Sequence, residues 1–140
     1  MSDENPIAIR GLDHVVIRCN DIDAMIAFYR DVLGCSVERE VEDLGLYQLR
    51  AGVSLIDLVD AAGKLGKMGG RPPNADGHNM DHFCVQVDPW DETAIIGHLE
   101  AHGIDADEVG IRYGALGKGP SIYIADPGGN TVELKGPPDS

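Results

Sequence analysis

The 140-residue chain has few basic residues: 11 Lys and Arg stand against 24 Asp and Glu, a formal net charge of -13. Nucleic acids and anionic membranes are bound by clustered Lys and Arg, so this balance argues against both kinds of partner. The sequence also lacks an apolar run near the roughly 20 residues that cross a bilayer, so we expect no membrane span. The charge excludes these partners without naming a substrate.

Cysteine is also scarce. Cys19, Cys35 and Cys84 are odd in number and form no Cys-x-x-Cys pair, which indicates free thiols in a reducing compartment rather than a disulfide scaffold. Residues 1–6 are acidic and lack the apolar segment of a signal peptide. These features predict a cytoplasmic protein. We expect Cys84 to be a packed core residue, as small cysteines usually are.

The order strand, helix, strand, strand, strand occurs twice along the chain. Alternating residues predict a first strand over 12–19, and apolar residues at helical spacing predict a helix over 22–33. The remaining strands of this half are expected at 35–41, 46–50 and 53–59. The second half is expected to have a helix capped by Asp88 and strands near 80–87, 106–112, 121–125 and 130–135.

This pattern predicts one α+β domain built from two βαβββ modules. The first module spans residues 10–59, a Gly- and Pro-rich linker spans 60–79, and the second module spans 80–136. A shift of 68 residues places the Asp-His pair at 13–14 on the pair at 81–82 and superposes the two helices. The modules are therefore interpreted as a structural repeat.

Four predicted strands have one uniformly apolar face and one mixed face. Because side chains alternate across a strand, the mixed faces carry His14, Asp57, His82 and Glu133. Two imidazoles and two carboxylates suit one divalent ion such as Ni, Co, Mn, Fe or Zn, and the ligands alone do not choose among these. The sequence therefore predicts a metal site between the modules. The remaining histidines lie in loop or helix positions and are not assigned a role.

Four segments together resemble the vicinal oxygen chelate superfamily, which includes glyoxalase I, bleomycin and fosfomycin resistance proteins and extradiol dioxygenases. They are residues 12–15, 27–34, 80–83 and 121–134, and the Phe-Tyr-x-x-Val-Leu-Gly and Asp-Pro-x-Gly-Asn-x-x-Glu-Leu runs are the most specific parts. The resemblance implies that the two modules form a half-open, eight-stranded, barrel-like sheet, often within a homodimer.

By position, the resemblance makes His14, His82 and Glu133 metal ligands. Asp57 falls where glyoxalase I has a glutamate that is both ligand and base. The implied activity is that of a metal-dependent, glyoxalase-like lyase or isomerase. Such an enzyme would act on a small oxygenated substrate through a metal-stabilised enediolate, with Asp57 and Glu133 as catalytic carboxylates. The ligands would meet either within one chain or across a dimer.

Two other functions remain open at this point. The protein could bind and sequester an antibiotic-like small molecule, or it could be an extradiol-type iron dioxygenase. Tyr123 and Glu133 fit the dioxygenase pattern, but the window that should hold a further histidine contains residues 114–116, Gly-Ala-Leu. The stretch from Arg112 to Gly117 resembles a glyoxalase-domain subgroup with members labelled virulence-associated. Arg112 and Lys118 are candidate binders of an anionic substrate group.

Overall fold

The strands of the computed structural model form two four-stranded sheets, and the structure describes residues 5–139. The absence of a signal peptide was predicted from residues 1–6, and residues 1–4 of that stretch lie outside the described range. One sheet has the order β1-β4-β3-β2, with strands His14–Cys19, Ser54–Asp60, Leu46–Ala51 and Ser36–Val41. The other has the order β5-β8-β7-β6, with strands Phe83–Gln86, Thr131–Lys135, Gly117–Ala125 and Gly110–Gly114.

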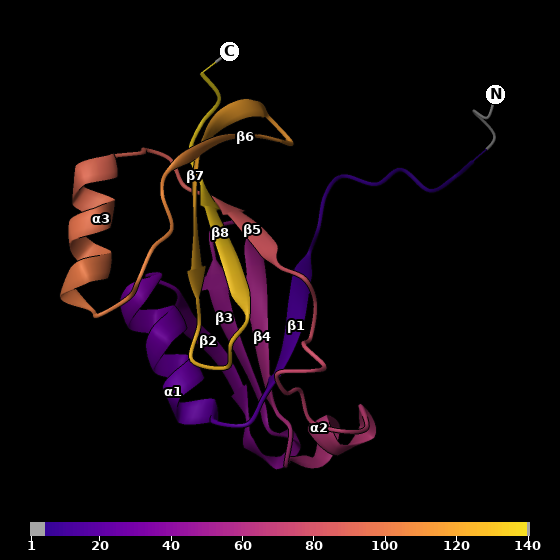
Figure 1. Cartoon of the computed structure of the whole chain (residues 1–140). Helices are drawn as coiled ribbons and strands as arrows, with labels where there is room; N and C mark the ends of the chain where they lie inside the picture. Colours follow the sequence, from indigo (N-terminus) through magenta and orange to yellow (C-terminus); the bar gives the residue numbers. More distant parts are fainter. Residues whose placement is uncertain (1–4, 140) are drawn as a thin grey trace.

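Both sheets share one topology, which confirms the predicted α+β fold. The first strand of each half pairs in parallel with the last, β1 with β4 and β5 with β8, and the other pairs are antiparallel. The sheets do not close into a barrel (Figure 1). Because the first strand of each half pairs with the last strand of that half, residues at the two ends of a half come to lie beside one another.

Two of the helices begin at aspartate caps. The Asp21 carboxylate accepts the Ala24 amide ahead of α1 (Ile22–Ala27), which continues as a π-helical turn, η1 (Phe28–Val32). Asp91, rather than the predicted Asp88, caps α3 (Glu92–Ala101) by accepting the Ala94 amide. The prediction placed this helix too early because a bend intervenes before the helix begins. The shorter elements are α2 (Lys64–Met68) and the 3₁₀ turn η2 (Glu42–Leu44).

One hydrophobic core connects the two halves. Helices α1 and α3 lie on the same side of the molecule (Figure 1). Buried Tyr29 of η1 and Leu99 of α3 belong to a core that includes Ile17, Leu58 and Ile122. Apolar faces of both sheets therefore pack against the helices, leaving the polar faces available for a site. Between residues 5 and 139, no helix has the length and apolar character needed to cross a membrane.

Candidate metal centre

The first predicted ligand pair lies on β1 and β4. The His14 Nε2 atom is 3.9 Å from Asp57 Oδ2, and the His14 Nδ1 atom is 2.8 Å from Asp13 Oδ2. Parallel pairing produces this arrangement, since Val16 is the register partner of Asp57 and His14 lies two residues earlier on the same face. The structure therefore brings together two predicted ligands that are far apart in the sequence.

The second pair repeats this geometry. His82 immediately precedes β5, and its Nε2 atom is 3.3 Å from Glu133 Oε1 on β8. The His82 Nδ1 atom is 2.6 Å from Asp81 Oδ1. Each half of the chain thus holds an aspartate, the histidine that follows it, and a carboxylate from the strand next to that histidine.

The preceding aspartates orient both imidazoles. When Nδ1–H donates to the aspartate, the lone pair of the neutral ring lies on Nε2, which faces the strand carboxylate. The hydrogen bond that His14 donates to Asp13, followed by the charge of Asp57, raises the pKa of His14 above 6.5. The hydrogen bond to Asp81 is likewise the largest cause of the raised pKa of His82. Both rings are therefore more basic than an isolated histidine.

Asp57 is the most constrained of the four side chains. It is only 4% exposed, and its Oδ2 atom accepts a hydrogen bond of 3.2 Å from Gln48 Nε2. Arg39 Nη1 donates to Gln48 Oε1 at 3.0 Å and so fixes the amide. Asp57 Oδ1 is buried and has no hydrogen-bond partner among the described residues. Gln48 was not predicted; the antiparallel register of β3 and β4 places it opposite Asp57.

The donor chemistry fits a divalent ion, with two imidazole nitrogens, two carboxylates and one buried oxygen that lacks a donor. The four side chains nevertheless form two separate pairs. Over residues 5–139, no three or more His, Cys, Asp or Glu side chains are grouped so that they could hold a metal ion. Each pair is therefore half of the predicted donor set.

Comparison with known proteins settles the family. Residues 11–134 match the model of the Glyoxalase/Bleomycin resistance protein/Dioxygenase superfamily. The chain belongs to this superfamily. It is 33% identical over 132 residues to the glyoxalase domain-containing protein RDO1 of Mycosarcoma maydis, a match that covers 94% of the chain and 70% of RDO1.

Two solved structures share this superfamily fold. Virulence protein STM3117 from Salmonella typhimurium superposes with a TM-score of 0.77 and 26% identity, covering 94% of this chain and 99% of that one. Lactoylglutathione lyase from Agrobacterium tumefaciens superposes with a TM-score of 0.65 and 25% identity, covering 91% and 94%. The resemblance to a virulence-associated subgroup is confirmed.

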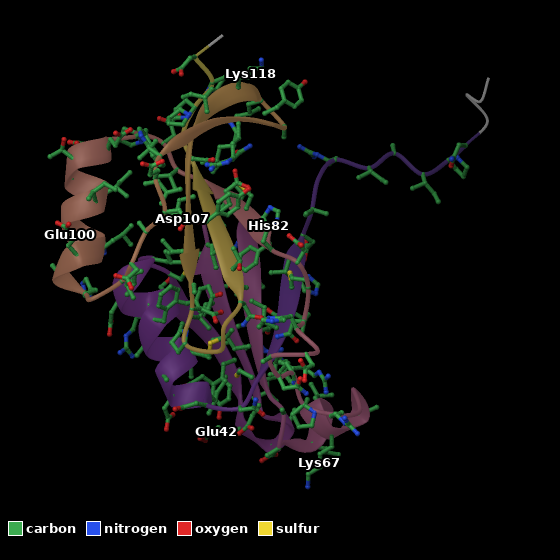
Figure 2. All side chains as sticks on the ribbon, in the orientation of Figure 1. Glu42, Lys67, His82, Glu100, Asp107 and Lys118 are labelled. Carbon is green, nitrogen blue, oxygen red and sulfur yellow. The ribbon has the colours of Figure 1, made fainter. Side chains whose placement is uncertain are left out.

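The two predicted substrate-binding cations occupy different environments in this superfamily member. The Arg112 guanidinium lies 4.6 Å above the Tyr123 ring and donates to Ser121 Oγ at 2.6 Å. Tyr123 in turn meets the His82 ring edge-on, with 5.4 Å between centroids. Lys118 is exposed on β7, away from His82 (Figure 2). Arg112 is therefore connected to the second pair through Tyr123, whereas Lys118 is not.

Cys84 is not the core residue that was expected. It is exposed on the same face as Glu133, its register partner on β8. Its thiol is nonetheless partly covered, and this burial, together with the Glu133 charge, raises the pKa of Cys84 to about 11. The sequence placed Cys84 on the ligand face, but that pattern did not show that the thiol is reachable from solvent.

Proposed function

We propose that this superfamily member is a metal-dependent lyase or isomerase of the glyoxalase type, acting on a small oxygenated substrate in the cytoplasm. The observation that supports the proposal is the repeated geometry of the two pairs. In each, an aspartate holds Nδ1 of the next histidine while Nε2 faces a buried carboxylate. Two solvated pairs without a shared role would not require the same orienting aspartate.

The proposed ligands of one divalent ion are His14, Asp57, His82 and Glu133. When bound, the ion would act as a Lewis acid on the oxygen atoms of the substrate. Asp57 would remove and return a proton between adjacent carbon atoms, because its unpartnered Oδ1 is available while Gln48 holds Oδ2. Burial of Asp57 and Glu133 excludes water from both carboxylates, which strengthens their electrostatic interactions.

A homodimer would complete the site. The pairs stay apart within the described part of one chain, so we propose that His14 and Asp57 of one copy meet His82 and Glu133 of a second. The polar face of β1 is open to such a contact, since Val16, on the same face as His14, is 48% exposed. A twofold dimer would then hold two equivalent sites.

Mixing two inactive variants tests both the metal and the shared site. His14→Ala and His82→Ala homodimers should each bind little metal. A 1:1 mixture refolded together should recover about a quarter of the wild-type metal content, because half of the dimers are mixed and each has one intact site. The control mixes wild-type protein 1:1 with the His14→Ala/His82→Ala double variant, whose mixed dimers have no intact site. Its metal content should fall to about a quarter, contributed by the wild-type homodimers, whereas a site within one chain would give about half.

Activity is measured on the same samples with a hemithioacetal substrate in the Ni²⁺, Co²⁺ and Zn²⁺ forms. Turnover that follows the recovered metal supports the lyase proposal. If wild-type protein binds metal but the mixed variants recover none, the site lies within one chain. If the protein binds metal but no metal form turns over the hemithioacetal, the glyoxalase I version of the proposal is wrong.

A small-molecule binding protein is the second candidate. It is favoured by the separation of the donors into pairs, which leaves residues 5–139 of each chain without a complete ligand set. Purified dimer that contains no metal, and whose unfolding temperature does not rise when Ni²⁺ or Zn²⁺ is added, would support binding over catalysis.

A further inference from the structure

A cavity of about 170 Å³ adjoins the second ligand pair. Its floor is the polar face of β5 and β8, where it is lined by Cys84, Gln86, Glu133 and Lys135. The turn between β6 and β7 covers it, and Leu116 from that turn is 63% exposed at its edge. The cavity therefore has a polar floor that includes a proposed metal ligand and a rim that is partly apolar.

Lys135 supplies the only positive charge among the residues that line this cavity. Alternation along β8 puts it on the same face as Glu133. It is only 6% exposed, and its Nζ atom donates to the Gly117 carbonyl at 3.0 Å. Its stem passes so close to Gly114 that a Cβ there would lie 2.9 Å from Lys135 Cε. The absence of a side chain at Gly114 is what makes room for the lysine.

The ammonium group is incompletely satisfied. It has three N–H donors, and the Gly117 carbonyl is its one partner found among residues 5–139. None of the ion pairs in that range includes Lys135. A buried charge without an ion-pair partner is costly, so the arrangement favours an anionic ligand. Gln86, the register partner of Lys135 on β5, lines the same cavity and adds an amide.

We propose that this cavity binds a carboxylate of the substrate, with Lys135 as its cationic partner and Gln86 as a second donor. The assignment rests on the proposed function for the position of the reacting end, which would lie at Glu133. Two residues along a strand span about 7 Å, so the carboxylate would lie that far from the reacting oxygen atoms. A single ammonium balances a carboxylate, whereas a phosphate dianion needs more positive charge.

The substrate class is therefore a short acid with vicinal oxygen atoms at one end and a carboxylate at the other. A matched pair of probes tests it: 2-hydroxyglutarate and 2-hydroxypentanoate have the same carbon chain, but only the first has the distal carboxylate. Isothermal titration calorimetry on the full-length protein, with and without Zn²⁺, gives both affinities. We expect 2-hydroxyglutarate to bind at least about tenfold more tightly, as a charged hydrogen bond allows.

Lys135→Met keeps the length of the side chain and removes its charge, so it should abolish this preference without changing the metal content. Lys67→Met is the matched control, because Lys67 is an exposed lysine on α2 at the other end of the molecule (Figure 2). Gln86→Leu, at an exposed position, should reduce the preference severalfold, and it serves as the second variant if Lys135→Met does not fold.

The outcomes separate this inference from the proposed function. Equal affinity of wild-type protein for the two probes would overturn the carboxylate site, even if metal binds. A preference that survives in folded Lys135→Met would also overturn it. A Lys135-dependent preference in a protein that binds no metal would keep the carboxylate site and remove the metal-dependent function.

Discussion

The orienting aspartates give the sharpest test of the metal centre. Asp81→Asn keeps the size of the side chain but removes the negative charge that holds His82 Nδ1 at 2.6 Å. Replacing such partners of metal-binding histidines usually costs 10–100-fold in affinity. Because the Asp81 side chain is 95% exposed, water weakens its hydrogen bond. We therefore expect a loss near the low end, about tenfold.

The pH dependence of this loss has a definite sign. Asp81 raises the pKa of His82, so protons compete with the metal at higher pH in the wild type than in the variant. The wild-type advantage should be complete well above this raised pKa, where the ring is neutral. It should narrow as pH falls through the raised wild-type pKa.

Competition titrations with a chromogenic chelator, using Zn²⁺ and Ni²⁺ across this pH range, measure both quantities. Asp88→Asn makes the same change in net charge at an exposed loop position and should leave metal affinity unchanged. Equal affinities of wild type and Asp81→Asn at the alkaline end of the titration, or an advantage that grows on acidification, would refute the orienting role.

Three further predictions concern other parts of the molecule. Tyr29→Phe removes a buried hydroxyl that donates to Asp126 Oδ2 at 2.7 Å, and should lower the free energy of unfolding in urea by about 1.5–3 kcal/mol; an unchanged midpoint would contradict this. Maleimide should label Cys84 alone, as the other two cysteines are buried. With its pKa raised to about 11, mainly by burial, the labelling rate should still be rising above pH 9.0; a plateau below that pH would oppose it. Gly119→Ala would push a Cβ against the Pro137 carbonyl and should cost about 1–3 kcal/mol, read from the thermal midpoint; a wild-type midpoint would show that the strand yields.

Much of the fold could be predicted because it depends on short-range periodicity. Strand alternation and helical spacing located the elements of both halves. Their ends were less certain: α3 begins after Asp91 rather than Asp88 because the chain first bends. Such boundaries depend on which carboxylate reaches a free backbone amide, and two nearby aspartates are equivalent in the sequence.

The candidate site likewise has one part that the sequence predicts and another that depends on tertiary structure. By itself, the sequence placed His14, Asp57, His82 and Glu133 on the polar faces of the predicted strands, since side-chain direction follows from strand alternation. Only the tertiary structure decided which of them meet: parallel pairing joins His14 to Asp57 and His82 to Glu133, and leaves the two pairs apart. The burial of Lys135 beneath the β6–β7 turn likewise depends on long-range packing. Local pattern fixes the direction of a side chain, but its partners depend on how distant strands pack.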